Sequence, residues 1–305
     1  MIYIDIVRIT YEDYSAEINL NRGGNCVSLK NKKYNADILH SGGDCDNPYV
    51  CGMPILFPAN RISNGEFDFE GRKYIFPINE PTTNCHLHGF LHTARFELVQ
   101  KTESFVKCRY NSDELYKFFP HEFRIEITYL LTDNGLLQEV CVANLSDTNM
   151  PVLLGFHTTF NIPFIPGESG KNIRVLSELD KEIERDGRHL PNGNILAVDE
   201  ISELLNNGQF VPFGNSISRH YKSGKNGKIE IIDAKNRLKI IYDTDKKFGW
   251  RLLYKPVDRN YICIEPQNCM VDCMNTSAKG IYGNYDYISP KTCKKYVSKI
   301  YVEEF

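Results

Sequence analysis

Apolar and polar residues alternate along much of this chain, and the alternation predicts β-strands. From Phe123 to Leu131 every second residue is apolar, and a second alternating run follows Asp133-Asn134-Gly135 as far as Asn144. Side chains of a strand point alternately to its two faces, and Asn-Gly favours tight hairpin turns, so the pattern predicts a hairpin. The same reasoning predicts hairpins over 66–76 and 228–243, and single strands over 261–265 and 295–303.

Helical patterns are few. A short helix is predicted over 199–208, with Asp199 as its N-cap and Gly208 as its end, and a single turn over 116–120. Many short strands without alternating long helices favour a sandwich or barrel over a parallel α/β fold. Neither a repeat nor a linker interrupts the pattern, so we expect one domain spanning 1–305.

Composition narrows the class of protein. Lys and Arg number 36 and Asp and Glu 39, and this net charge of -3 argues against a nucleic-acid or anionic-membrane surface. No apolar run reaches the length of a membrane span, and the first residues do not resemble a signal peptide. We therefore expect a cytoplasmic protein whose ten cysteines, none in a Cys-x-x-Cys pair, are reduced.

Two segments in the first third of the chain place polar side chains beside predicted loops. Asn60 and Arg61 follow an apolar run, and the Arg61 guanidinium either binds hydroxyls or carboxylates of a ligand or pairs with an acid at the surface. His86 and His88 lie two residues apart, so in a strand they would share one face. That pair could begin a metal site, but the sequence offers no convincing further ligands, and we expect a polar pocket wall without metal.

Two later segments contain candidate acid–base groups. His157 follows an apolar run and lies among aromatic residues; it is either a hydrogen-bonded core histidine or a proton donor. Glu265 stands at the expected end of an apolar strand, just before Pro266, and is either a rim carboxylate or a group held over a cleft. The motifs of serine hydrolases, P-loop proteins and dinucleotide-binding proteins are absent from the sequence.

Taken in order, four short motifs resemble the aldose 1-epimerase family, whose members are mutarotase-like proteins. They are Asn60-Arg61-Ile62, His86-Leu87-His88-Gly89, Gly155-Phe156-His157-Thr158-Thr159-Phe160 and Ile264-Glu265-Pro266. The resemblance runs from about Gly23 to the last strand. It implies an all-β galactose mutarotase-like supersandwich of two large antiparallel sheets, with the site in a cleft and no cofactor.

The resemblance also implies roles for individual residues. Glu265 matches the general base and His157 the general acid, while the sugar-binding candidates are Arg61, His88, Asn60, His86 and His220. In place of the Asn-His-Ser-Tyr-Phe of galactose-specific members, this chain has Phe-His-Thr-Thr-Phe. Their sugar-binding aspartate has no evident counterpart, and the corresponding stretch offers His220.

Such an enzyme would interconvert α and β anomers of an aldohexose, as a monomer or a homodimer. We expect Glu265 and His157 to face each other across a gap one pyranose wide, with the carboxylate ionised and the imidazole protonated. Two alternatives stay open. A hexose-6-phosphate 1-epimerase would need a basic cluster, for which the candidates are Arg219, Lys222 and Lys225. A non-catalytic sugar-binding or regulatory protein could share the fold.

Overall fold

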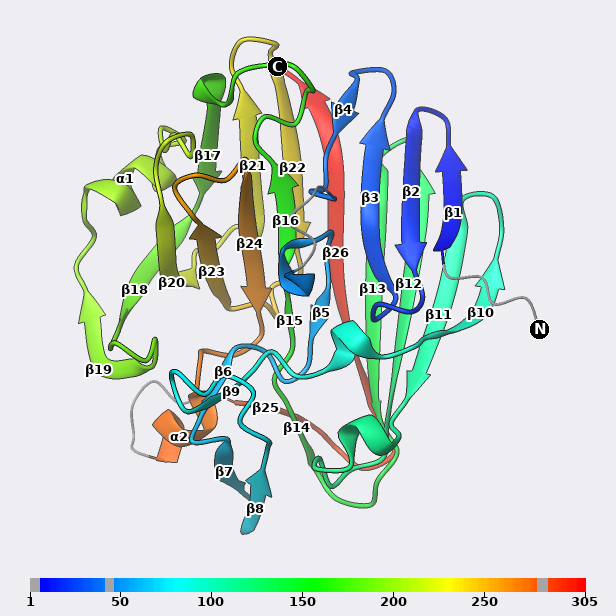
Figure 1. The fold of residues 1–305 in the computed structure, drawn as a ribbon, viewed down its shortest axis with the longest axis vertical. Coiled ribbons are helices and arrows are strands. Elements are labelled where there is room, and N and C mark those ends of the chain that lie inside the picture. The colour runs from blue at the N-terminus through cyan, green and yellow to red at the C-terminus, as the bar shows by residue number, and fades with distance from the viewer. Residues whose placement is uncertain (1–5, 42–46, 279–284) are drawn as a thin grey trace.

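The computed structural model describes residues 6–41, 47–278 and 285–305, and it confirms the expected sandwich of two large antiparallel sheets (Figure 1). One, which we call the back sheet, has the strand order β10-β11-β12-β13-β26-β22-β21-β17. Its strands are β10 (Glu97–Lys101), β11 (Phe105–Asn111), β12 (Phe123–Thr132), β13 (Gly135–Asn144), β17 (Ile173–Ser177), β21 (Lys228–Asp233), β22 (Leu238–Thr244) and β26 (Cys293–Glu304).

The opposite sheet, which we call the site sheet, has the order β19-β18-β20-β23-β24-β15-β5, and β16 also pairs with β24. Its strands are β5 (Ile55–Leu56), β15 (Gly155–Phe156), β16 (Thr158–Asn161), β18 (Leu179–Arg185), β19 (Pro191–Leu196), β20 (Ile217–Ser223), β23 (Trp250–Lys255) and β24 (Tyr261–Gln267). A four-stranded sheet lies beside it over the back sheet, where β1 and β2 contact β11 and β12 (Figure 1). That sheet contains β1 (Ile6–Tyr11), β2 (Tyr14–Asn19), β3 (Asn25–Asn31) and β4 (Ala36–Asp37).

Short elements gather at one end of the sandwich (Figure 1). They form the pairs β6 (Arg61–Ser63) with β9 (Cys85–Leu87), β7 (Glu66–Phe69) with β8 (Arg72–Ile75), and β14 (Met150–Val152) with β25 (Asp286–Ile288), together with helix α2 (Cys273–Ala278). The predicted helix is α1 (Glu200–Asn206), whose N-cap Asp199 accepts a hydrogen bond from the Ser202 amide. The turn expected over 116–120 is a 3₁₀ helix that begins earlier, at Glu114–Tyr116. Across the described ranges, no helix is both long and apolar enough to cross a bilayer.

The predicted hairpin strands are confirmed because burial follows their sequence alternation. Every second residue of β12 is buried, and β12 pairs with β13 from Phe123 opposite Asn144 to Thr132 opposite Gly135. One expectation about cysteines was wrong, since Cys51 is disulfide-bonded, while eight others carry free thiols. The even number of cysteines allows disulfides, but their spacing does not indicate that Cys51 forms one.

Aromatic packing between the two large sheets determines which way His157 points. Phe156 contacts Phe248 with ring centroids 4.8 Å apart, and the Thr158 hydroxyl shares a hydrogen bond of 2.8 Å with the Tyr242 hydroxyl of β22. Both neighbours therefore face the interior, where burying a large apolar side chain contributes roughly 1.5–3 kcal/mol. Alternation along the chain then directs the His157 side chain to the opposite, outer face of the site sheet.

The prediction that β24 ends at Glu265 was wrong, because Pro266 lies inside the strand. On one side of β24, Gly155 of β15 pairs with Gln267. The pairing on that side resumes in β16, where Thr158 lies opposite Ile264. Glu265 and Pro266 thus lie opposite the break between β15 and β16. A proline there removes no ladder hydrogen bond on that side, so the strand continues.

Candidate active site

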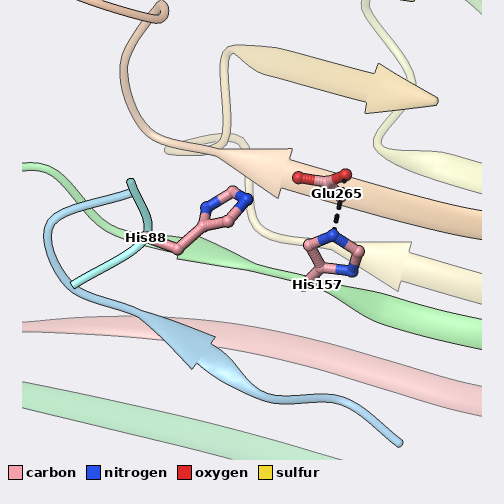
Figure 2. Close-up of side chains that lie close together, drawn as sticks. All are labelled: His88, His157 and Glu265. Carbon is pink, nitrogen blue, oxygen red and sulfur yellow. Dashed lines mark ion pairs between the residues drawn. The ribbon is translucent and has the colours of Figure 1, made fainter. Parts of the chain in front are cut away.

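The break between β15 and β16 brings His157 into contact with Glu265. The Nε2 atom of His157 lies 3.2 Å from Oε1 of Glu265, and both side chains are almost fully buried, at 6% and 2% exposed (Figure 2). The expected pyranose-wide gap between them is absent. A ligand therefore does not fit between the two side chains and would contact both from the cleft.

A chain of amide side chains holds the Glu265 carboxylate. Gln267, two residues further along β24 and so on the same face, donates through Nε2 to Oε2 of Glu265 at 3.3 Å. The Oε1 atom of Gln267 in turn accepts a hydrogen bond of 3.2 Å from Nδ2 of Asn60. Asn60 therefore supports the carboxylate through Gln267, a residue that the sequence analysis did not single out although its spacing from Glu265 could have indicated it.

His88 is the third group of the cluster, and it comes from a turn. It follows β9 with φ of 61°, so the alternation of that strand ends before it. Its Nδ1 atom accepts a hydrogen bond of 3.2 Å from the Asn60 backbone amide, which leaves Nε2 as the protonated nitrogen of the neutral ring. The rings of His88 and His157 lie 5.5 Å apart, nearly perpendicular, and Figure 2 shows His88 beside the pair. His88 therefore offers an N–H donor next to the acid–base pair.

Arg61 is both a cleft residue and half of an ion pair. Its Nε and Nη2 atoms donate to the two carboxylate oxygens of Glu80 at 2.6 and 2.7 Å. Burial alone would raise the pKa of Glu80, but the hydrogen bonds from Arg61 and Thr83 outweigh it and lower that pKa. Such a bidentate pair fixes the guanidinium plane, so Arg61 presents its remaining donors in one orientation.

One cleft of about 320 Å³ on the outer face of the site sheet contains His157, Glu265, His88, Arg61 and Asn60 in its lining. This volume is within the usual range for small-molecule sites. Its described lining comprises Asn47, Tyr49, Val50, Asn60, Arg61, Glu80, Leu87, His88, His157, Arg185, His189, Ser218, Leu252, Tyr254 and Glu265. The sequence analysis missed Arg185, Ser218 and Tyr254, since only the lateral order of the sheet places their strands, β18, β20 and β23, in succession on one side of β24.

Two expected sugar-binding histidines lie elsewhere. His86 is buried among Phe76, Phe90 and Phe118 and contacts the Pro77 carbonyl through Nδ1 at 2.8 Å. His88 therefore does not share its face, because the positive φ at His88 turns the chain. His220 is also fully buried, with its ring edge-on to Trp250, and is not among the cleft lining. Neither histidine has the access that the binding role requires.

The basic cluster required for a phosphorylated sugar does not form at the cleft among the described residues. Arg219 pairs with Glu182 and Asp199, at 3.0 and 2.7 Å. Lys222 lines a separate hollow beside Trp250, and Lys225 lines a third depression. The three candidates are therefore either neutralised or directed to other surfaces.

Comparison with known proteins identifies the family of this chain. The family model described as aldose 1-epimerase matches residues 5–282. The chain belongs to the aldose 1-epimerase family. The resemblance of the four motifs is thereby confirmed, and the chain is an isomerase of the epimerase type.

Similarity to individual proteins agrees with the assignment of this chain to the aldose 1-epimerase family. The structure of a galactose mutarotase-like protein from Clostridium acetobutylicum is 30% identical with a TM-score of 0.92, covering 98% of this chain and 95% of that one. LacX (chromosomal) of Lactococcus lactis subsp. lactis is 24% identical over 74% of this chain and 79% of LacX. Galactose mutarotase of Sus scrofa is 31% identical over 50% of this chain and 44% of its own length.

Burial determines the charge state of the epimerase cluster, and the expected charges were wrong. Desolvation raises the pKa of Glu265 to about 8, although Arg185, Gln267 and Arg61 favour its carboxylate. Desolvation also lowers the pKa of His157 to about 4 and that of His88 well below its ordinary value. At neutral pH the pair therefore carries one proton and no net charge, with the proton on Glu265.

The same three residues are the metal-ligand candidate among the described residues. One ligand atom from each of His88, His157 and Glu265 lies within 4.8 Å of the others. Two imidazoles and one carboxylate are ligand types that Zn²⁺ accepts. However, Nδ1 of His88 is occupied by the Asn60 amide, and the 3.2 Å contact joins the other two groups directly. The distance between His157 and Glu265 is that of a hydrogen bond, which permits proton transfer between them.

Proposed function

We propose that this chain is an aldose 1-epimerase that interconverts the α and β anomers of a pyranose, with Glu265 and His157 as its acid–base pair. The observation that carries the proposal is the 3.2 Å contact between Oε1 of Glu265 and Nε2 of His157 at the bottom of a small cleft. The anomeric carbon bears two reacting oxygens, its hydroxyl and the ring oxygen. Because both are bonded to one carbon, two adjacent protein groups reach both of them.

The reaction needs one base and one acid at the same time. Glu265, as carboxylate, accepts the proton of the C1 hydroxyl while protonated His157 donates to the ring oxygen. The C1–O5 bond breaks, C1 becomes an aldehyde, and rotation about C1–C2 presents its other face. Closure reverses both proton transfers and restores the pair. Only protons move and one C–O bond breaks and re-forms, so the chemistry requires no cofactor.

The neutral resting pair is compatible with these roles. Moving its single proton from Glu265 to Nε2 of His157, across the 3.2 Å contact, creates the carboxylate and imidazolium without changing the net charge. Hydrogen bonds from the sugar hydroxyl to the carboxylate, and from the imidazolium to the ring oxygen, stabilise that charged form. Substrate binding therefore drives the proton shift that prepares the pair.

Three further residues would hold the sugar. His88 directs its Nε2–H toward the pair and would donate to the C1 hydroxyl or the ring oxygen. Arg61, fixed by Glu80, would donate to hydroxyls further round the ring. Asn60 acts through Gln267 on the position of the carboxylate. The expected sugar-binding set thus reduces to Arg61, His88 and, indirectly, Asn60.

The decisive test is a panel of anomer-exchange measurements by NMR with galactose, glucose, other aldoses and their 6-phosphates. We expect the protein to accelerate exchange between the C1 signals of at least one free aldose far above the rate in buffer. Calorimetric binding of sugars without acceleration would instead support a non-catalytic sugar-binding protein. A strict requirement for a 6-phosphate would support the phosphorylated alternative.

The pH dependence follows from the need for one shared proton. Above the pKa of Glu265, about 8, the pair loses its proton and has no acid; below that of His157, about 4, it gains a second and has no base. We expect kcat/KM to be greatest between these values and to fall on both sides. Polarimetric rates, corrected for exchange in buffer and accompanied by circular dichroism to monitor folding, would measure this. A rate that stays constant up to pH 10 would contradict the assignment.

A further inference from the structure

Arg185 is a cleft residue that neither the motifs nor the proposed mechanism uses. It is the last residue of β18, and its Nη2 atom donates to the carbonyl oxygen and the hydroxyl of Ser218 on β20, at 2.5 and 3.2 Å. No carboxylate of the described residues lies within ion-pair distance of its guanidinium, and its Nε and Nη1 atoms have no hydrogen bond there. Its positive charge is therefore directed into the cleft without a counterion.

The other charges of the cleft compensate one another. Arg61 is matched by Glu80, and the Glu265–His157 pair is neutral when it holds one proton. Burial lowers the pKa values of His88 and His189, so both rings are uncharged at neutral pH. Glu182, an acid of the same strand whose charge acts on Arg185, forms an ion pair with Arg219, and Glu184 accepts hydrogen bonds from Asn192 and Asn194. The described lining thus carries one net positive charge, and it belongs to Arg185.

The order of the strands separates the backbone of Arg185 from that of the reacting pair. The sequence of neighbours is β18, β20, β23, β24, so three strand spacings of about 4.8 Å separate the backbones that carry Arg185 and Glu265. The Arg185 side chain covers part of that span, since it reaches Ser218 on the next strand. A pyranose whose C1 and ring oxygen contact Glu265 and His157 leaves the rest of the cleft, toward Arg185, for the remainder of its ring and for the substituent on C5, which lies next to the ring oxygen.

We propose that Arg185 binds an acidic substituent of the sugar, so that the preferred substrate is an aldose carrying one carboxylate, such as a hexuronic acid. The inference rests on the proposed function and specifies its substrate class. A guanidinium with two unused donors matches a carboxylate, and a partly desolvated arginine without a counterion gains most from a ligand of opposite charge. A single arginine fits one negative charge, whereas a phosphate dianion calls for the cluster that this cleft lacks.

The test compares glucuronate with glucose, and galacturonate with galactose, by NMR anomer exchange in the parent protein, in Arg185→Gln and in Arg124→Gln. Arg124 is a matched control, because it lies on β12 of the back sheet and its Nε bonds only Asn111. We expect the ratio of kcat/KM for uronate over neutral sugar to fall roughly tenfold to a hundredfold in Arg185→Gln, as for loss of a hydrogen bond to a charged group. The ratio should be unchanged in Arg124→Gln.

Several outcomes would overturn the inference while leaving the proposed function intact. The first is that the parent exchanges the anomers of neutral sugars faster than those of uronates. The second is that Arg185→Gln lowers kcat/KM equally for both classes of sugar and also shifts the alkaline limb of the pH profile to higher pH. The second result would mean that Arg185 acts on the Glu265 carboxylate. A preference for the 6-phosphate over the uronate would overturn the choice of a carboxylate. Calorimetry with glucuronate and the inactive Glu265→Gln protein measures binding separately, so failure of catalysis is distinguishable from failure of recognition.

Discussion

Glu265→Gln is expected to lower kcat for anomer exchange by at least about two orders of magnitude, the usual contribution of a positioned acid or base. The amide keeps nearly the same shape and still accepts a hydrogen bond from Gln267, but it cannot take the proton of the C1 hydroxyl. Saturation-transfer NMR on the C1 protons, or polarimetry after dissolving one crystalline anomer, would measure the loss. Near-normal turnover would remove Glu265 from the mechanism.

A stability measurement separates this catalytic effect from misfolding. The pKa of Glu265 is about 8 in the folded protein, against 4.5 for an ordinary glutamate. Between these values the folded chain holds a proton that the unfolded chain has released, so this group's stability contribution is complete below about pH 4.5 and is lost as pH rises toward 8. Glutamine has no such dependence. The thermal midpoint of Glu265→Gln relative to the parent should therefore increase from pH 5 to pH 9.

His157→Gln is expected to lower kcat by a factor of about 10² to 10⁴, because the ring oxygen loses its proton donor. Glutamine can place an amide near the position of Nε2, so the contact with Glu265 persists as a neutral hydrogen bond while proton transfer is lost. The same exchange measurement applies, and unchanged near-ultraviolet circular dichroism would show that the packing around Phe156 and Thr158 is retained. Activity within a few-fold of the parent would show that another group protonates the ring oxygen.

The double variant tests whether the two residues act as one unit. If Glu265 and His157 share the single proton of the reaction, removing either partner disables both transfers. The double substitution should then be about as slow as the slower single variant, and its losses should not multiply. Multiplicative losses would indicate two independent contributions instead.

The strands and the family were accessible from sequence because both depend on short-range information. Alternation over 123–144 and over 228–243 specified which side chains face a core, and the turn residues specified where the chain reverses. The four ordered motifs identified the family, which the match to residues 5–282 confirms. Where the local rule failed, at Pro266, the cause was non-local: a break between two partner strands that are distant in sequence.

The same distinction between local and non-local information applies to the residues of the site. The identities of Glu265, His157, His88 and Arg61 were available as residue types in recognisable motifs, but the sequence could not distinguish the cleft residue His88 from the core residue His86. The positive φ at His88, stabilised by its bond to the Asn60 amide, makes that distinction. Likewise, His220 lies in the stretch where the family's sugar-binding aspartate is expected, yet packing against Trp250 buries it.

By itself, then, the sequence determined an all-β sandwich of the aldose 1-epimerase family and supplied one carboxylate and one imidazole for its chemistry. Only the tertiary structure decided that these groups touch, that burial leaves them with one shared proton, and that Arg185 adds an uncompensated charge to the cleft. The reason is physical. Alternation and turn preference act between neighbours in the chain, whereas desolvation and electrostatic compensation depend on which strands lie side by side.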